Sequence, residues 1–295
     1  MPQRDLKSVK YASYASVVVA CILILAKFFA WQVTGALSLQ ASLIDSVLDG
    51  LASLLNMFAI REAHRPPDAE HRFGHGKIEA IGALAQSIFI FGSASWLFYE
   101  AGNRFLHPES VEEAGIGLGG MGFSIVLTLA LVLYQKHVFK RTHSIAIQAD
   151  SIHYQSDLFI NISVIIALLG SRFNGMSFLD PLIGTGIAAY ILYTAWKVVA
   201  QSFDILIDRE FSQEDRQKII QLVLNHPQVL GYHDLRTRSS GTQKFIQIHL
   251  EMDGDLTLKT AHKISLEVIL KIQQAFPYTE VLIHEDPSGE IDDHP

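Results

Sequence analysis

The chain has 295 residues, of which 49% are hydrophobic and 18% are charged, and its formal net charge at pH 7 is −7. Soluble domains carry about 25% charged residues, so this composition favours a membrane protein. The lack of a Lys and Arg excess excludes a basic nucleic-acid-binding protein, and we expect no nucleic acid as a partner. The single cysteine, Cys21, excludes an internal disulfide framework and a CxxC site for zinc or redox chemistry.

Six apolar stretches in the first two thirds of the chain have the length of membrane-spanning helices, which need about 20 residues each. The first stretch is too long for a signal-peptide core and has no small-residue cleavage site, so it should stay as a helix. Its one lysine, Lys27, is expected to snorkel towards the membrane interface. The sequence therefore predicts a protein of the lipid bilayer with six transmembrane helices. The stretches cover residues 11–32, 37–60, 78–105, 115–134, 144–171 and 178–200.

Basic residues are distributed unevenly between the two sides of these stretches. Ten lie before the first stretch or in the loops after the second and fourth, whereas the loops of the other side hold only Arg104 and Arg172. Because loops rich in Lys and Arg stay in the cytoplasm, we expect a multi-pass protein of the inner cell membrane with both termini in the cytoplasm. The ten basic residues are Arg4, Lys7, Lys10, Arg61, Arg65, Arg72, Lys77, Lys136, Lys140 and Arg141.

After residue 207 the continuous apolar stretches give way to the periodic pattern of a small soluble domain. Helical spacing covers residues 211–225 and 258–276, with Ser212 as the expected N-cap of the first helix. Alternating apolar and polar residues predict strands at 233–238, 244–252 and 280–286. The order αββαβ predicts a two-layer α+β domain of the metallochaperone or ferredoxin-like type.

These patterns predict three parts of the chain. We expect a six-helix transmembrane domain at 1–207, a cytoplasmic αββαβ domain at 208–287 and an acidic, disordered tail at 288–295. Nine basic and 15 acidic residues follow residue 207, so nearly all of the net negative charge belongs to the cytoplasmic domain and the tail.

Four ionisable side chains interrupt the apolar stretches in a regular pattern. Asp45 and Asp49 lie in the second stretch, and a second pair, His153 and Asp157, lies in the fifth. The four-residue spacing puts both side chains of a pair on one helix face, where each costs at least about 2.5–3.5 kcal/mol on membrane insertion scales. Two such faces turned towards each other supply one nitrogen and three oxygens for a divalent cation. The alternative is that the four residues only cap, pair or hydrogen-bond within the helix bundle.

Three motifs resemble signatures of the cation diffusion facilitator family. They are SLIDSVLD at 42–49, FGHGK at 73–77 and DSIHYQSD at 150–157. The six stretches and the αββαβ order are also similar to this family, so the resemblance covers nearly the whole chain. It implies a homodimeric secondary transporter, not an enzyme, which exports divalent metal in exchange for protons. It also implies that the transport site consists of Asp45, Asp49, His153 and Asp157.

The donor set of this site limits the choice of metal. One nitrogen and three oxygens suit Zn²⁺, tolerate Fe²⁺, Cd²⁺ and Mn²⁺, and lack the sulfur expected for Cu(I). The resemblance favours zinc, both as the transported ion and as a structural or regulatory ion, and no organic cofactor is expected. Because histidine and carboxylates also bind protons, metal and protons are expected to compete for the site.

The loop after the second stretch holds a candidate second metal site. Asp68, His71 and His75 lie in a short glycine-containing loop that can fold back to bring them together. Exposed loop histidines are also commonly just solvated, and the resemblance favours metal binding over this alternative. The resemblance further suggests a salt bridge between Lys77 and Asp208, which would join the two domains near a dimer axis and contribute about 1 kcal/mol.

The predicted cytoplasmic domain carries a third cluster. His249 lies on the polar face of its strand, and His284 and Asp286 share one face of the last strand. Together with His233 and His262 they exceed the needs of one ion, and the resemblance implies a binuclear zinc site bridged by Asp286. The alternative is a sheet face whose histidines are hydrogen-bonded within the protein. Metal bound here would draw two acidic domains together. We therefore expect this site to sense metal or to brace a homodimer.

Two other functions stay open at this point. An intramembrane aspartyl protease needs two membrane aspartates, which Asp49 and Asp157 could supply, but it does not require Asp45 and His153 as well. A metal-gated channel would use the same ligands as an antiporter and would differ only in energetics. Uphill metal transport driven by a pH step separates an antiporter from a channel.

Overall fold

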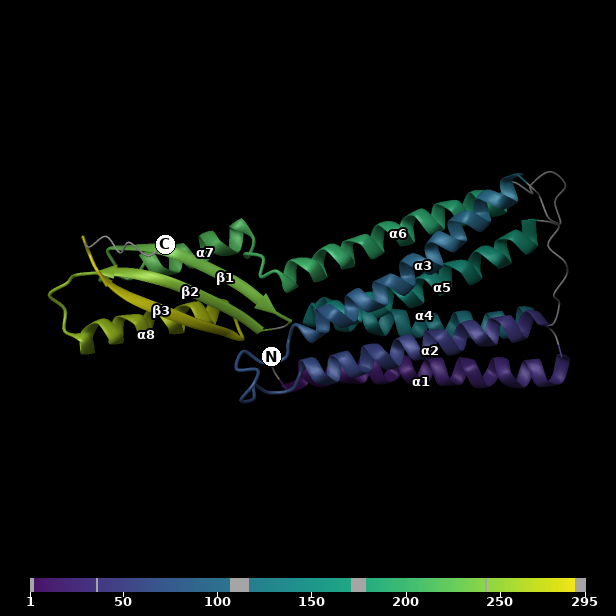
Figure 1. The fold of residues 1–295 in the computed structure, drawn as a ribbon, viewed down its shortest axis with the longest axis horizontal. Helices are drawn as coiled ribbons and strands as arrows, with labels where there is room; N and C mark the ends of the chain where they lie inside the picture. The colour runs from purple at the N-terminus through teal and green to yellow at the C-terminus, as the bar shows by residue number, and fades with distance from the viewer. Residues whose placement is uncertain (1–2, 36, 107–116, 171–178, 242, 290–295) are drawn as a thin grey trace. The chain divides into compact units, whose positions relative to one another are not determined.

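The computed structural model describes residues 3–35, 37–106, 117–170, 179–241 and 243–289. The chain divides into two compact units, residues 2–203 and residues 204–295. The described part of the first unit is helical, and the second unit contains a three-stranded sheet with helices (Figure 1).

The first unit is built from long helices that run alongside one another (Figure 1). Each predicted apolar stretch falls on one of them, although α1 begins well before its stretch, α6 ends after its stretch, and 115–116, 171 and 178 lie outside the described residues. The fourth helix continues to Thr142 because its polar last turns, with Lys140 and Arg141, extend beyond the apolar stretch. The helices are α1 (Gln3–Thr34), α2 (Leu37–Ala63), α3 (Ile78–Leu106), α4 (Gly117–Thr142), α5 (Ile145–Gly170) and α6 (Leu179–Leu206).

Five helices of the described part are long and apolar enough to cross a membrane. The helix α5 is not among them, although it has 26 residues. The first half of α5 carries polar side chains, including Asp150, His153 and Asp157, which lower the hydropathy of that half. Six spans, with α5 as the fifth, therefore stay a prediction. The five candidate spans are Leu6–Val33, Ser42–Ala63, Ile78–Asn103, Gly122–Thr142 and Pro181–Leu206.

Small residues allow close approach of these helices, while large apolar side chains cover their outer faces. A Cβ atom built on Gly82 of α3 would lie 2.5 Å from the Cβ of Ala59 on α2, so the two backbones nearly touch there. On the outside, Ile88, Trp96 and Val126 are exposed. An extended apolar surface of this kind is typical of a protein that contacts lipid.

The second unit follows the predicted αββαβ order. Ser212 caps the first helix as expected, because its side chain accepts a hydrogen bond from the N–H of Asp215 at 3.2 Å. The strands extend a few residues beyond the predicted bounds, since polar residues at their ends also pair with the neighbouring strand. Residues 290–295 of the predicted acidic tail lie outside the described residues. The elements are α7 (Gln213–Leu224), β1 (Gly231–Ser240), β2 (Gln243–Met252), α8 (Leu258–Ala275) and β3 (Thr279–Pro287).

The sheet has the strand order β1-β2-β3, with β2 antiparallel to β1 and parallel to β3. One face of β2 is buried, where Ile248 and Leu250 pack in one core with Ile219 of α7 and Val268 of α8. Successive side chains of a strand point to opposite faces. The alternate residues of β2, including His249, therefore lie on the face opposite the two helices.

Candidate metal centres

The first cluster lies between α2 and α5 of the first unit. Asp49 comes from α2, and His153 and Asp157 come from α5, one helical turn apart. The Nε2 of His153 lies 3.1 Å from Oδ1 of Asp49 and 3.9 Å from Oδ2 of Asp157. This buried nitrogen has no partner in hydrogen-bonding geometry among the described residues. One imidazole and two carboxylates therefore converge with donor atoms suited to a divalent cation.

A pocket lies beside this cluster and is lined by both of its carboxylates. Asp45 is exposed, one helical turn before Asp49 on α2, and it is not part of the three-residue group. The structure thus brings together three of the four residues predicted for this site. The pocket is lined by Ala20, Leu23, Lys27, Ser46, Asp49, Ser124, Thr128, Tyr154, Asp157 and Asn161.

Lys27 of α1 also lines this pocket, which differs from the expectation that it snorkels to the interface. Its Nζ donates hydrogen bonds to the backbone oxygen of Ser42 at 3.1 Å and to Oγ of Ser46 at 2.6 Å, both on α2. No local pattern in the sequence predicts this contact, because it depends on how α1 packs against α2.

A buried carboxylate one turn before His153 ties α5 to three other helices. Asp150 accepts a hydrogen bond from Gln86 of α3 at 2.8 Å. It also accepts bonds from Gln135 of α4 at 2.7 Å and from Ser16 of α1 at 2.5 Å. Asp150 has no exposed surface. The sequence placed Asp150 within a motif but could not show that three helices converge on it.

A second set of buried contacts fixes the first turn of α5. The carboxylate of Glu79 on α3 accepts hydrogen bonds from the hydroxyl of Ser144 and from the N–H of Ala146, the latter at 3.4 Å. Asn56 of α2 donates to the backbone oxygen of Ala146 at 3.2 Å. Since the first N–H groups of a helix lack partners within it, these contacts anchor the helix that supplies two of the three clustered residues.

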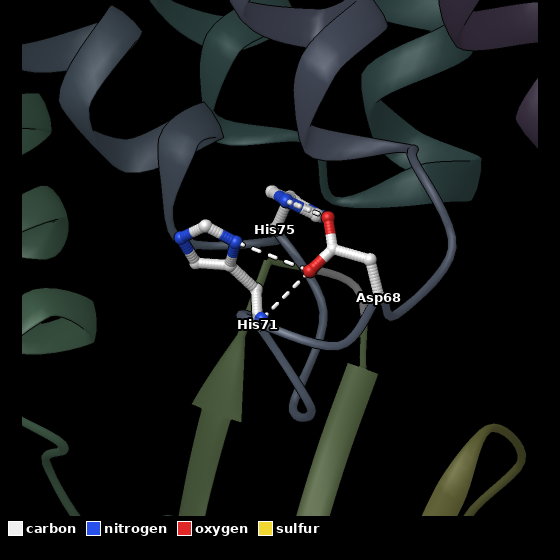
Figure 2. A group of neighbouring side chains, drawn as sticks. All are labelled: Asp68, His71 and His75. Carbon is white, nitrogen blue, oxygen red and sulfur yellow. Dashed lines mark hydrogen bonds and ion pairs between the residues drawn. The ribbon is translucent and has the colours of Figure 1, made fainter.

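The second cluster lies in the loop between α2 and α3 and has Asp68 at its centre (Figure 2). Oδ1 of Asp68 lies 3.3 Å from Nδ1 of His71, and Oδ2 lies 3.4 Å from Nε2 of His75. The centroids of the two imidazole rings are 4.6 Å apart. Gly74, with φ of +78°, permits the reversal that brings His75 back towards Asp68. All three residues predicted for this loop are therefore neighbours.

Backbone N–H groups favour the charged form of Asp68. Its Oδ1 accepts hydrogen bonds from the N–H of His71 at 2.7 Å and from the N–H of Glu70 at 3.0 Å. The bond from His71 is the largest cause that lowers the pKa of Asp68. His75 is buried, and its Nδ1 has no hydrogen-bond partner among the described residues. A charged carboxylate and two imidazoles fit a divalent cation.

The third cluster lies on the sheet of the second unit. The strand register places His233, His249 and His284 in one row across β1, β2 and β3. Glu251 and Asp286 pair with each other in a second row, two residues further along their strands. Residues two apart on a strand share a face, so the register alone assembles these five side chains on one side of the sheet.

Asp286 is the centre of this third cluster. Its Oδ2 lies 2.8 Å from Nδ1 of His249 and 3.2 Å from Nε2 of His233. Its Oδ1 lies 3.1 Å from Nε2 of His284. Because the two oxygens face different histidines, this carboxylate has the geometry to bridge two cations. His262 is exposed on α8, and the structure does not bring it into the group formed by His233, His249 and Asp286.

Two acidic residues that the sequence analysis missed lie beside these histidines. Oε1 of Glu251 lies 3.1 Å from Nδ1 of His233, and Oδ2 of Asp234 lies 3.9 Å from Nε2 of His249. Glu251 could have been found from strand alternation, since it follows His249 by two residues. Asp234 could not, because it has φ of +47° at an irregularity in the pairing of β1.

The predicted salt bridge between Lys77 and Asp208 joins residues of different units. Within the second unit, Oδ1 of Asp208 lies 3.6 Å from Nη1 of Arg238. The pairing of Lys77 with Asp208 stays a prediction.

Comparison with known proteins gives two matching families. Residues 13–207 match the cation efflux transmembrane domain, and residues 211–288 match the cation efflux protein cytoplasmic domain. A protein of Shewanella oneidensis named cation-efflux pump FieF is 48% identical over 279 residues, which cover 95% of this chain and 94% of the relative. A protein of the same name from Yersinia enterocolitica is 44% identical over 283 residues, with 96% and 94% covered. A solved metal-bound C-terminal domain of the CzcD transporter from Thermotoga maritima is 26% identical, covers 28% of this chain and 100% of its own, and has a TM-score of 0.27.

Proposed function

This chain belongs to the cation efflux family of membrane transporters, and we propose that it is an antiporter that exports Zn²⁺ from the cytoplasm in exchange for protons. Its relatives are named cation-efflux pumps, so its activity is the transport of metal cations and not an enzymatic reaction. The observation that carries the proposal is the convergence of Asp49, His153 and Asp157 from two helices beside a pocket. A bound cation would offset the carboxylate charges that are costly within a membrane.

Asp45 is proposed as the fourth ligand of this transport site. It lies on the same face of α2 as Asp49, because residues four apart are one helical turn from each other. A tetrahedral zinc ion needs four donors, and the described cluster offers one nitrogen and two carboxylates. Rotation of the exposed Asp45 side chain towards the pocket would complete the set.

Proton exchange is proposed to use the same side chains. Zinc binds carboxylates and neutral imidazole only in their deprotonated forms, so each binding event releases protons and each protonation weakens metal binding. With the site open to the cytoplasm, metal displaces protons. With the site open to a more acidic exterior, protons displace metal.

Reconstitution into liposomes tests this function directly. With an imposed pH gradient and no initial metal gradient, Zn²⁺ should move in the direction opposite to the proton flow and build up a gradient of its own. Each transported ion should be accompanied by a measurable proton flux. Liposomes that contain the Asp49→Ala variant are the control for leakage. Comparison of Zn²⁺, Cd²⁺, Fe²⁺ and Mn²⁺ would rank the substrates. Zinc flux that ignores the pH gradient would contradict proton coupling.

The loop cluster and the sheet cluster are proposed as sites for resident zinc. In the loop, Asp68, His71 and His75 would hold one ion. On the sheet, Asp286 would bridge two ions, supported by the separate histidines that face its two oxygens. We also propose that metal at the sheet site senses zinc or braces a homodimer, since it would reduce the repulsion between two acidic domains. The sheet ligands would be His233, His249, His284 and Asp286, with His262 as a further ligand.

The proposed arrangement in the cell follows from the same family membership. A transmembrane transport domain of six helices at 1–207 would lie in the inner membrane with both termini in the cytoplasm, where the domain at 208–287 also lies. Lys77 and Asp208 would pair between the two domains and bias their relative position.

A metal-gated channel remains the alternative function with the same ligands. It would dissipate a zinc gradient but could not build one. In the liposome experiment, a channel gives zinc movement only down its own gradient, whatever the pH on the two sides.

A further inference from the structure

Lys27 places a basic side chain in the pocket beside the proposed transport site. Its Nζ is held on α2 by the backbone oxygen of Ser42 and the hydroxyl of Ser46. The same pocket is lined by Asp49 and Asp157. The lysine is therefore oriented by two acceptors towards the face of α2 that carries the metal-binding carboxylate.

The charge of this side chain acts on both the metal-free and the metal-bound state of the pocket. When no metal is bound, the ammonium stabilises the carboxylates, because its opposite charge offsets the repulsion between them in a medium of low polarity. It also repels a divalent cation, and that repulsion acts on twice the charge. A lysine fixed beside the site therefore favours the metal-free state over the metal-bound state.

We infer that Lys27 is an internal counter-cation that weakens metal binding at the transport site and so promotes release of the ion. This inference rests on the proposed transport function of Asp49, His153 and Asp157. Lys27 is not a ligand, because an ammonium has no lone pair for a metal. It sets the affinity of the site, and so the balance between metal uptake and release.

A purely structural role for Lys27 predicts different behaviour. If the side chain only links α1 to α2, then any neutral residue that keeps the hydrogen bonds to Ser42 and Ser46 should preserve metal affinity. Glutamine offers two N–H donors for these oxygens but carries no charge. The substitution Lys27→Gln therefore separates the charge from the link between the helices, while Lys27→Arg keeps the charge.

The test measures Zn²⁺ binding to the full-length protein by calorimetry, in a background that carries Asp68→Ala and Asp286→Ala to remove the other two clusters. We expect Lys27→Gln to lower the zinc Kd by at least about tenfold, because one positive charge leaves the pocket. Lys27→Met should give the same shift, and Lys27→Arg should stay within about threefold of the parent. The matched control is Lys197→Met, which removes a lysine that lies over the ring of Tyr193 on α6, outside this pocket.

Transport provides the second readout. In liposomes, Lys27→Gln should lower both the KM for zinc and the maximal rate, because tighter binding slows release. An unchanged or raised Kd in a folded Lys27→Gln or Lys27→Met protein would overturn the inference, and so would an equal shift in Lys197→Met. If Asp49→Ala leaves zinc binding intact in the same background, the proposed transport site itself is wrong, which is a separate result. Ser46→Ala keeps the charge of Lys27 but removes one of its two hydrogen-bond acceptors. This variant should change the zinc Kd less than Lys27→Gln does.

Discussion

The membrane cluster and the sheet cluster use the same donor types with opposite burial. Between α2 and α5 the imidazole of His153 is buried, and the carboxylates of Asp49 and Asp157 are partly exposed. On the sheet the carboxylate of Asp286 is buried, and the histidines around it are more exposed. Carboxylates that face a pocket suit an ion that must enter and leave, whereas a buried carboxylate suits an ion that stays.

The two clusters also differ in how they are held. On the sheet, backbone pairing fixes His249 opposite both His233 and His284, so the geometry is set by main-chain hydrogen bonds. In the membrane region the geometry depends on side-chain contacts between helices, above all those of Asp150. A helix-borne site can change when helices move, which a transport cycle requires, whereas a strand-borne site resists such change.

The largest expected effect is the loss of transport in Asp49→Ala. Removal of one of the clustered ligands should reduce zinc flux by at least about 100-fold, while the protein stays folded because apolar packing and other buried contacts hold the bundle. Flux in liposomes and size-exclusion chromatography check the two parts of this expectation. Asp45→Ala, measured in parallel, should be nearly as severe if Asp45 is the fourth ligand. Near-normal flux in Asp49→Ala would contradict the assignment of the cluster between α2 and α5 as the transport site.

Asp150→Asn should give the next largest effect, through the helix contacts and not through a ligand. Ser16, Gln86 and Gln135 all donate to the carboxylate of Asp150. In asparagine one carboxylate oxygen is replaced by an NH₂ group, which is itself a donor, so at least one of these buried donors would lose its acceptor. We expect a loss of about 2–3 kcal/mol in stability together with reduced flux. Thermal unfolding of the full-length protein measures this loss. Ser163→Ala on the same helix is the matched control, because its hydroxyl donates to the backbone oxygen of Ile160 in the preceding turn and not to another helix of the described part.

A partial effect is expected for His249→Ala on the sheet. If this cluster senses metal or braces a dimer, the change should lower transport several-fold and weaken zinc-dependent dimerisation without abolishing flux. Flux assays measure the change in transport, and analytical ultracentrifugation with and without zinc measures the change in dimerisation. His262→Ala is the comparison variant: this exposed histidine lies outside the described group, so its loss should have a smaller effect than that of His249 even if it is a further ligand. Complete loss of transport in an intact His249→Ala dimer would place the sheet metal on the obligatory transport cycle.

The smallest expected effect concerns a pair in the second unit, the buried His226 and the exposed Glu267. His226 accepts the N–H of Gln228 at Nδ1, so its Nε2 can donate to Glu267, 3.1 Å away. This bond is the largest cause that lowers the pKa of Glu267 below its ordinary value of 4.5. A carboxyl with a lowered pKa stabilises the fold above about pH 4.5 and loses that contribution as the pH falls through its folded value.

Glu267→Gln should therefore lower the melting temperature slightly at pH 7, and the difference from the parent should shrink as the pH falls below about 4.5. Melting curves of the full-length protein at several pH values measure this trend. Glu280→Gln changes another exposed carboxyl and serves as the control. A difference that grows on acidification would contradict the sign of this pKa shift.

Much of the architecture could be predicted because it depends on local patterns. Apolar stretches of membrane length and the αββαβ order follow from residue periodicity, and the structure has helices and strands at these places. The four-residue spacing of His153 and Asp157 fixed their common helix face in advance. Strand alternation likewise placed His284 and Asp286 together, since the side-chain period of a strand is two residues.

Other features arose only from tertiary packing. The contacts of Lys27 with Ser42 and Ser46, and the convergence of three helices on Asp150, join residues far apart in the sequence. No local period encodes which helices pack together or at what depth. The sequence by itself determined which side chains share a face of each element. The tertiary structure decided which faces meet, because helix packing brings together donors and acceptors that the chain keeps far apart.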